Sequence, residues 1–177
     1  MSLPHALLTA LLEQPSTGFE LAKRFDRSMS YYWHATHQQI YRELARMEKS
    51  GQIATEESAD SKSRVKTYYV LAAGKAELER WVQTPSDITP LRESLMIKLR
   101  ADAVIGPLAL EAEVKQRILV HQQRLAIYQQ LEAQYFAEPN PNREMRLKHL
   151  ILQTGMRYEQ HCLDWSNHVL EVLASDL

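Results

Sequence analysis

Apolar and polar residues recur along the chain with two different periods, which predict several helices and one β-hairpin. Apolar residues spaced by three and four positions predict helices, over residues 3–13, 19–25, 37–50, 74–82, 91–103, 110–137 and 143–173. Two segments after the third helix, residues 52–57 and 65–71, are β-branched and aromatic with polar alternation. We expect them to pair as a hairpin around the polar residues 58–64.

Short motifs predict where several of these elements begin and end. Thr36, followed by Gln39 three positions later, matches a capping box at the start of the third helix. Gly51 suits a left-handed stop at the end of that helix. Residues 16–18 are expected to form a turn with a capping residue ahead of the second helix.

A segment with two prolines, residues 83–90, is the best boundary between two domains. Its prolines and small polar residues interrupt the helical pattern on both sides. We therefore expect one domain over residues 1–84 and another over residues 85–177. In the last helix of the first domain the apolar side chains are expected to be buried, namely Leu78, Trp81 and Val82.

The two long C-terminal helices each carry a sustained apolar stripe, which predicts antiparallel, coiled-coil-like pairing. The first stripe comprises Val114, Ile118, His121, Leu125, Tyr128, Leu131 and Tyr135. The second comprises Leu147, Ile151, Thr154, Tyr158, Cys162, Trp165, Val169 and Leu173. One long neighbour cannot cover both apolar faces. We therefore expect a second copy of the chain to cover part of them, at Tyr158, Trp165, Val169 and Leu173.

Composition narrows the class of protein. The 177 residues are 45% apolar and 24% charged, as in an ordinary globular chain, and the single cysteine, Cys162, excludes an internal disulfide. No apolar run approaches the length of a membrane span, and no basic region precedes an apolar stretch at the start. We therefore expect a cytoplasmic protein with no membrane partner. Because the net charge is only −1, binding to nucleic acid would depend on where the charges lie.

The order of three helices, a hairpin and a fourth helix is that of a winged helix-turn-helix, whose third helix enters a major groove. With Ile40, Leu44 and Met47 facing inward, a helical projection places three cations and two amides on the outer face and no acid. That face comprises Gln38, Gln39, Arg42, Ala45, Arg46 and Lys49. Arginine and glutamine can pair with base edges or hold phosphates. The start of the helix, at Thr36, His37 and Gln38, can offer backbone N–H groups to a phosphate.

The hairpin adds a second group of cations. Lys62, Arg64 and Lys66 lie within five residues with no acid between them, in an expected wing over residues 58–66. Such a wing can follow the DNA backbone or enter a minor groove. A basic helix face and a basic wing in this order predict DNA binding.

Several segments resemble the PadR family of bacterial transcriptional regulators. They read LPHALL (3–8), TGFEL (17–21), WHATHQQIYREL (33–44) and KTYYVL (66–71). The segments LRESLMIKL (91–99) and YEQHCLDW (158–165) resemble the helical C-terminal domain of the longer members, and the likeness is greatest to the virulence-gene activators.

The resemblance implies a mainly α fold, with an N-terminal winged helix-turn-helix and an all-helical C-terminal dimerisation domain. It also implies a homodimer that binds a palindromic operator in double-stranded DNA. Gln39, Tyr41 and Arg42 match the family's reading helix, and residues 62–66 match its wing. Ala72 departs from the Thr or Ser that often caps the last winged-helix helix, which removes about 1 kcal/mol of capping. A small-molecule effector stays open, because no effector residues carry over.

Other classes of function have weaker support in the sequence. The chain has no Gly-rich phosphate loop, no serine elbow and no Cys–His pair in a catalytic context, so we expect neither an enzyme nor a cofactor. His161, Asp164 and His168 share a helix face and could bind a metal, and Cys162 beside them could serve a redox role. The more ordinary interpretation is a polar helix face with one buried thiol. A winged helix used only for protein contact would be expected to have a neutral or acidic third helix. The aromatic residues 31–33 could line a ligand pocket, although they more often pack between helices.

Overall fold

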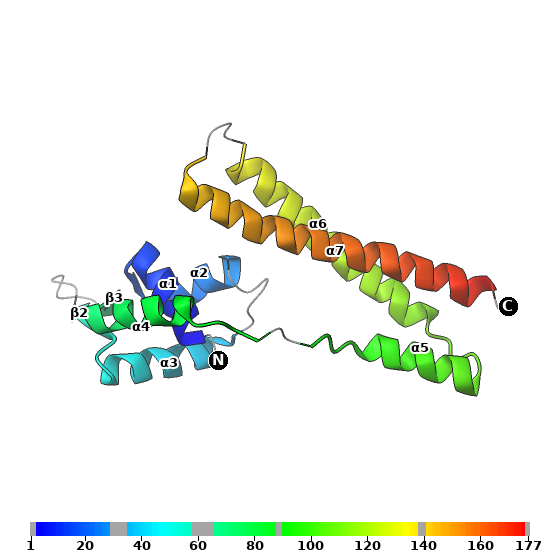
Figure 1. The fold of residues 1–177 in the computed structure, drawn as a ribbon, viewed down its shortest axis with the longest axis horizontal. Helices are drawn as coiled ribbons and strands as arrows, with labels where there is room; N and C mark the ends of the chain where they lie inside the picture. The colour runs from blue at the N-terminus through cyan, green and yellow to red at the C-terminus, as the bar shows by residue number, and fades with distance from the viewer. Residues whose placement is uncertain (1–2, 29–34, 58–65, 88–89, 138–140, 176–177) are drawn as a thin grey trace. The chain divides into compact units, whose positions relative to one another are not determined.

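The structure is a computed structural model that describes residues 3–28, 35–57, 66–87, 90–137 and 141–175. Its elements in chain order are α1 (Leu3–Glu13), β1 (Ser16–Thr17), α2 (Gly18–Ser28), α3 (His37–Lys49), β2 (Ile53–Glu57), β3 (Lys66–Val70), α4 (Ala72–Gln83), α5 (Ser94–Ile105), α6 (Glu111–Tyr135) and α7 (Arg143–Ser175) (Figure 1). The chain divides into two compact units, Met1–Thr89 and Pro90–Leu177. None of the described helices is long and apolar enough to cross a membrane.

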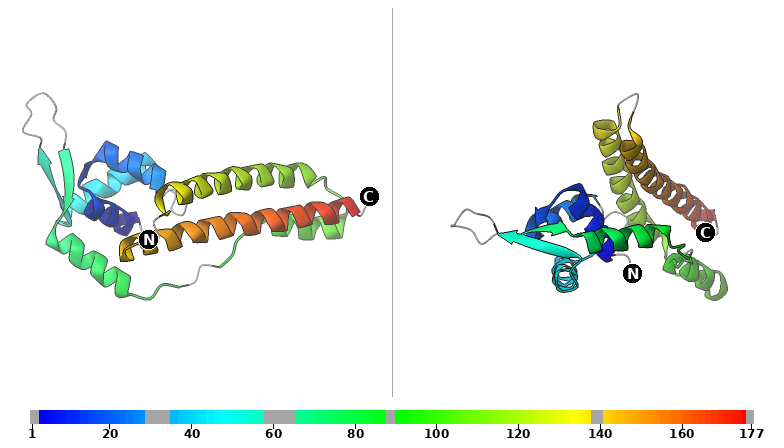
Figure 2. Two further views of the ribbon diagram at one scale, coloured as in Figure 1. Left: turned by 90° about the horizontal axis from the view of Figure 1, so that it is seen from above. Right: turned by 60° about the vertical axis from the view of Figure 1, so that its left-hand side comes forward.

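The N-terminal unit holds a three-stranded antiparallel sheet in the order β1-β3-β2. The predicted hairpin is confirmed, because Ile53 on β2 pairs with Val70 on β3 (Figure 2). The turn predicted at residues 16–18 is wrong in part, because Ser16 and Thr17 form β1 and pair with Tyr68 and Thr67. Two residues are too few to show the alternation of apolar and polar positions that is typical of a strand. They form a strand because β3 supplies their hydrogen-bond partners.

Helices α1, α2 and α3 close one apolar core over the sheet. The predicted inner face of α3 is confirmed, because Ile40, Leu44 and Met47 are all fully buried. They pack in one cluster with Leu7, Leu8, Ala10, Leu11, Leu21, Ala22, Phe25, Ala35 and Ile53. The N-terminal unit therefore closes an apolar core of its own, although Phe19 on α2 is 65% exposed.

Helix α4 differs from the prediction. Trp81 and Val82 were expected in the core, but their side chains are 38% and 69% exposed, and only Leu78 is partly buried. The ring of Trp81 instead stacks on His5 of α1, with ring centroids 4.4 Å apart. The buried contact of α4 is Gly74, where an added Cβ would lie 2.3 Å from the carbonyl oxygen of Gln52. The helix has no side-chain cap, but it begins at Ala72, two residues earlier than predicted, so that the uncapped N-cap position is Leu71 rather than Ala72.

The C-terminal unit consists of α5, α6 and α7, and the two long helices lie side by side along their length (Figures 1 and 2). All three predicted helices are present, but α5 begins at Ser94 rather than Leu91. The side chain of Glu93 accepts a hydrogen bond from the backbone N–H of Leu95 and so caps the helix. Gly106, with φ of 109°, follows the last turn.

The face that α7 turns inward is partly different from the predicted stripe. Its buried residues are Glu159, Leu163, Ser166 and Val169. From the predicted stripe, Leu147, Ile151 and Tyr158 are instead 45–55% exposed. The predicted and observed faces differ because Glu159 and Ser166 are buried. A prediction from the spacing of apolar residues leaves such polar residues out of the core.

Candidate nucleic-acid interface

Helices α2 and α3 begin with the same kind of cap. The predicted capping box of α3 is confirmed: the Gln39 N–H donates to the Thr36 hydroxyl, and the Thr36 N–H donates to the Gln39 side chain at 2.8 Å. At α2, the Thr17 N–H donates to the Glu20 carboxylate at 3.0 Å, and the Glu20 N–H donates back to the Thr17 hydroxyl. The Thr17 backbone hydrogen bond holds the pKa of Glu20 below its usual value. The capping residue predicted within residues 16–18 is thus Thr17, and the spacing Thr-x-x-Glu would also have identified the full capping box.

The outer face of α3 is exposed at every predicted position. Gln38, Gln39, Arg42, Ala45, Arg46 and Lys49 all lie in solvent. Among the described residues, Arg42 and Lys49 have no ion pair, so both cations are available to a polyanion. The side chain of Tyr41 is 44% exposed, and its ring lies against Gly18 at the start of α2, where an added Cβ would be 2.6 Å away.

Four of the predicted DNA-binding side chains already have protein partners: those of Arg46, His37, Gln39 and Thr36, the last two within the cap of α3. Arg46 donates from Nε to Glu43 at 2.8 Å, and this hydrogen bond raises the pKa of the guanidinium. His37 Nε2 lies 2.7 Å from the carboxylate of Asp26 on α2. The side-chain oxygen of Gln39 is occupied in the cap. The sequence analysis did not predict Glu43 and Asp26 as partners of Arg46 and His37. A helical projection shows which side of a helix a residue lies on, but not which side chains form ion pairs.

The wing is described only at its base. Lys66 is exposed at the start of β3, opposite Glu57 of β2. Lys62 and Arg64, together with most of the predicted wing 58–66, lie outside the described residues. The aromatic residues Tyr31, Tyr32 and Trp33 also lie outside them.

The four residues predicted at a dimer interface have different environments within one chain. Val169 is only 7% exposed and packs in the internal cluster with Leu95, Val114, Ile118 and Leu163. Trp165 and Leu173 are partly buried beside that cluster, whereas Tyr158 is 55% exposed. Many other large apolar side chains of the unit are exposed, namely Leu91, Met96, Ile97, Val104, Ile105, Leu108, Leu119, Ile127, Tyr135, Leu147, Leu150, Ile151 and Val172.

The structure does not support the alternative metal site at His161, Asp164 and His168. Asp164 accepts a hydrogen bond from Gln160, and His168 lies beside Glu171. Within the described segments, no three His, Cys, Asp or Glu side chains gather as metal ligands. The redox alternative is also weakened, because burial raises the pKa of the Cys162 thiol and so disfavours the reactive thiolate.

The three N-terminal helices with the exposed α3, the three-stranded sheet and the hairpin define the class of this protein as a winged helix-turn-helix with a helical C-terminal domain. Residues 7–80 match the transcriptional regulator PadR-like family, and residues 91–174 match the family described as "Virulence activator alpha C-term". The chain belongs to the PadR family of transcriptional regulators.

Individual relatives agree over almost the whole length. The probable transcriptional regulator Rv1176c of Mycobacterium tuberculosis is 38% identical over 185 residues, which cover 98% of each chain. The structure of the Vibrio cholerae virulence activator AphA is 29% identical with a TM-score of 0.85, and the match covers 99% of this chain and 100% of that one. The structure of Bacillus subtilis PadR in complex with operator DNA is 20% identical with a TM-score of 0.83, covering 97% and 98%. These relatives are regulators of transcription rather than enzymes.

Proposed function

We propose that this protein is a sequence-specific DNA-binding regulator that acts as a homodimer, with α3 in the major groove and the wing on the DNA backbone or in the minor groove. The observation that carries the proposal is the outer face of α3. It is exposed, its helix is capped at Thr36, and it presents Arg42 and Lys49 without acid partners in the described chain. The structure of PadR with operator DNA supports the same role through the shared fold.

The contacts on α3 divide by position along the helix. Gln38 and Arg42 lie one turn apart near the N-terminus, the end of a recognition helix that reads base edges. We assign them to base contacts, and we assign Lys49 at the far end to a phosphate. Arg46 is held by Glu43 through Nε and one terminal nitrogen, so only part of its guanidinium can face DNA. Lys66 at the base of the wing is a backbone contact in this arrangement.

A dimer is supported by the apolar surface of the C-terminal unit. Ile97, Val104 and Ile105 on α5 are 73–81% exposed. Large exposed apolar patches commonly mark interaction sites. A two-fold dimer would place two copies of α3 about 34 Å apart, one turn of DNA, on a palindromic site. Tyr158 and the partly buried Trp165 and Leu173 stay part of the proposed interface, whereas Val169 would act from inside the subunit.

The decisive experiment begins with selection of bound genomic fragments by the purified protein, followed by titration of the selected site. Arg42→Ala should weaken binding to that site by about 1–3 kcal/mol and leave binding to a scrambled site nearly unchanged. Lys75→Ala removes an exposed cation from α4 and serves as the control. Equal losses on both DNAs would make Arg42 a phosphate contact. No selected fragment, or no loss on either DNA, would refute the assignment of α3.

A further inference from the structure

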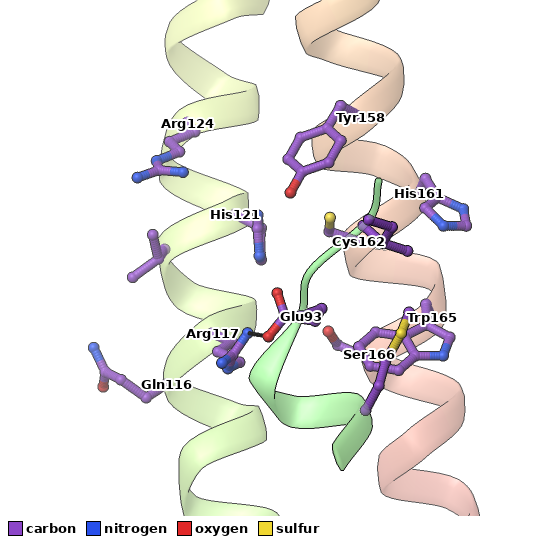
Figure 3. Close-up of a pocket in the computed structure, with 13 residues that line it drawn as sticks. Glu93, Gln116, Arg117, His121, Arg124, Tyr158, His161, Cys162, Trp165 and Ser166 are labelled. Carbon is purple, nitrogen blue, oxygen red and sulfur yellow. Dashed lines mark hydrogen bonds and ion pairs between the residues drawn. The ribbon is translucent and has the colours of Figure 1, made fainter. Parts of the chain in front are cut away.

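Two glutamates lie at contacts between elements of the fold, one in each unit. Glu159 on α7 pairs with His121 on α6, beside a cavity of about 390 Å³ (Figure 3). Tyr158 and Trp165 line that cavity, so it belongs with the proposed dimer interface.

The second glutamate lies in the N-terminal unit. Glu48, near the end of α3, accepts a hydrogen bond from the hydroxyl of Thr55 on β2 at 2.8 Å. This contact joins the proposed recognition helix to the hairpin that leads into the wing. Neither side chain belongs to the proposed DNA contacts, so the contact has a role still to be assigned.

The charge of Glu48 is unfavourable at its position in two respects. Glu48 lies in the last turn of α3, where the helix dipole disfavours a negative charge. It also lies on a helix that we expect to bind a polyanion, and a carboxylate there repels phosphates. Glu43 on the same helix is neutralised by Arg46, whereas no cation pairs with Glu48 among the described residues. Breaks in an otherwise consistent pattern are expected at functional sites.

The contact lies over the middle of the hairpin. Thr55 pairs across the sheet with Tyr68 on β3. Burial and then the charge of Glu48 raise the pKa of the Tyr68 hydroxyl, and Tyr41, two turns before Glu48 on α3, raises it further. One side of α3 therefore faces this pair of strand residues.

The same two strands lead to the wing. Glu57, two residues after Thr55 and about 7 Å further along β2, pairs with Lys66 at the base of the wing. The apolar core also holds the inner face of α3, but apolar contacts are not directional. A hydrogen bond between oxygens requires a separation of about 2.5–3.0 Å and a nearly straight angle. The bond between Thr55 and Glu48 therefore restricts rotation of α3 about its own axis relative to the hairpin.

Such a rotation matters for the recognition of bases. Turning α3 by about 15° would move side-chain atoms that lie about 5–6 Å from its axis by about 1.5 Å. Hydrogen-bond distances vary over only about 0.5 Å, so a base contact through two hydrogen bonds would be lost. We propose that the hydrogen bond between Thr55 and Glu48 sets the sequence specificity of DNA binding, which makes both residues positioning residues. It fixes the direction in which Gln38 and Arg42 point while the wing lies on the DNA. This inference rests on the proposed DNA binding by α3.

The test compares the affinities of the purified full-length protein for the selected site and for the scrambled site at one salt concentration. Thr55→Val keeps the shape of the side chain and removes the donor. It should lower the ratio of the two affinities about tenfold, as the loss of a bidentate base contact would, while binding to the scrambled site is retained. Thr55→Ser keeps the hydroxyl and should keep the ratio. Thr9→Val is the matched control, because the Thr9 hydroxyl donates to a backbone oxygen within α1, and it should change neither affinity.

Glu48→Gln separates the hydrogen bond from the charge. The side-chain oxygen of glutamine can still accept from Thr55, so the ratio of affinities should be retained. Removal of the negative charge should strengthen binding to both sites several-fold at low salt. A purely structural role would give a different result, because partial unfolding lowers both affinities by the same factor and leaves their ratio unchanged.

The outcomes distinguish this inference from the proposed function. A parent protein that prefers the selected site, together with a Thr55→Val variant that keeps the full preference, would overturn the inference and leave DNA binding by α3 in place. Equal losses of preference in Thr55→Val and Thr55→Ser would also overturn it, because the hydroxyl would not be the cause. A parent with no preference between the two sites would refute the proposed function, and this inference with it.

Discussion

The two units of this chain differ in how much of their apolar surface they bury. The N-terminal unit gathers twelve buried residues in one cluster, most of them no more than 1% exposed. In the C-terminal unit the cluster has five, while many larger apolar side chains on α5, α6 and α7 stay in solvent. A layered domain can enclose its own core, whereas one pair of long helices and a short third leave faces uncovered. The described part of the N-terminal unit therefore has a closed core of its own, although Phe19 and Val82 are exposed there, and the difference supports a C-terminal surface that a second copy covers.

The largest effect should come from the closed core. Leu44→Ala removes a fully buried side chain of α3 and should lower the free energy of unfolding by about 2–5 kcal/mol. Leu12→Ala on α1, where the leucine is 46% exposed, is the matched control and should cost well under half as much. Urea unfolding followed by circular dichroism measures both. If the two losses are equal, the N-terminal core is not closed in the way described.

Substitutions at two glycines, one in each unit, test how closely the neighbouring atoms pack against the helix. Gly74→Ala should destabilise the protein by about 1–3 kcal/mol, because its Cβ would lie 2.3 Å from a backbone oxygen that cannot move aside. Gly155→Ala on α7 brings a Cβ to 3.1 Å from the ring of Tyr128, which can shift by the few tenths of an ångström required. Its cost should be smaller, and the gain in helix propensity can offset it. Thermal unfolding of both variants ranks them, and the reverse order would contradict this account of the close contact at α4.

The open apolar surface is tested by association. Ile151→Glu places a charge on α7 where the isoleucine is 50% exposed, and it should raise the dissociation constant of the dimer at least tenfold, since about 1.4 kcal/mol corresponds to that factor. Leu12→Glu makes the same kind of change on the N-terminal unit and should have no effect on association. Sedimentation equilibrium distinguishes a dimer from the 20.5 kDa chain. A parent protein that sediments as a monomer at micromolar concentration would exclude the dimer and the palindromic site.

The smallest effect concerns acid stability of the N-terminal unit. Arg80 and then His5 hold the pKa of Glu77 at about 2, below its ordinary value of 4.5. A lowered pKa in the folded state means that these pairs stabilise the protein above pH 4.5, and that the contribution is lost as the pH falls towards 2. Glu77→Gln should therefore flatten the fall in the urea midpoint over this range. Glu79→Gln, at an exposed position of the same helix, is the control, and a Glu77→Gln curve parallel to the parent's would show that the pairs contribute nothing.

Helix α3 shows how far local signals reach. The pair Thr36 and Gln39, the apolar spacing of Ile40, Leu44 and Met47, and Gly51 with φ of 71° all act within a few residues. Capping and amphipathic periodicity are short-range effects. For this reason the sequence alone placed the helix, its inner face and its exposed cations correctly. The basic wing followed from the same kind of local pattern, although only Lys66 of its cations falls in the described chain.

Long-range contacts decided the rest. Ser16 and Thr17 are a strand because β3 lies beside them, and Trp81 is half-exposed because it meets His5, 76 positions away in the chain, rather than the core. Glu159 is buried because His121 on the opposite helix supplies its partner. A polar side chain is stable inside a protein only where another chain segment completes its hydrogen bonds. The type and spacing of residues in one segment do not show which distant residue will be that partner. The sequence therefore established helix α3, its exposed face and the class of fold, and only the tertiary structure located the polar contact between α6 and α7 and the cavity beside it.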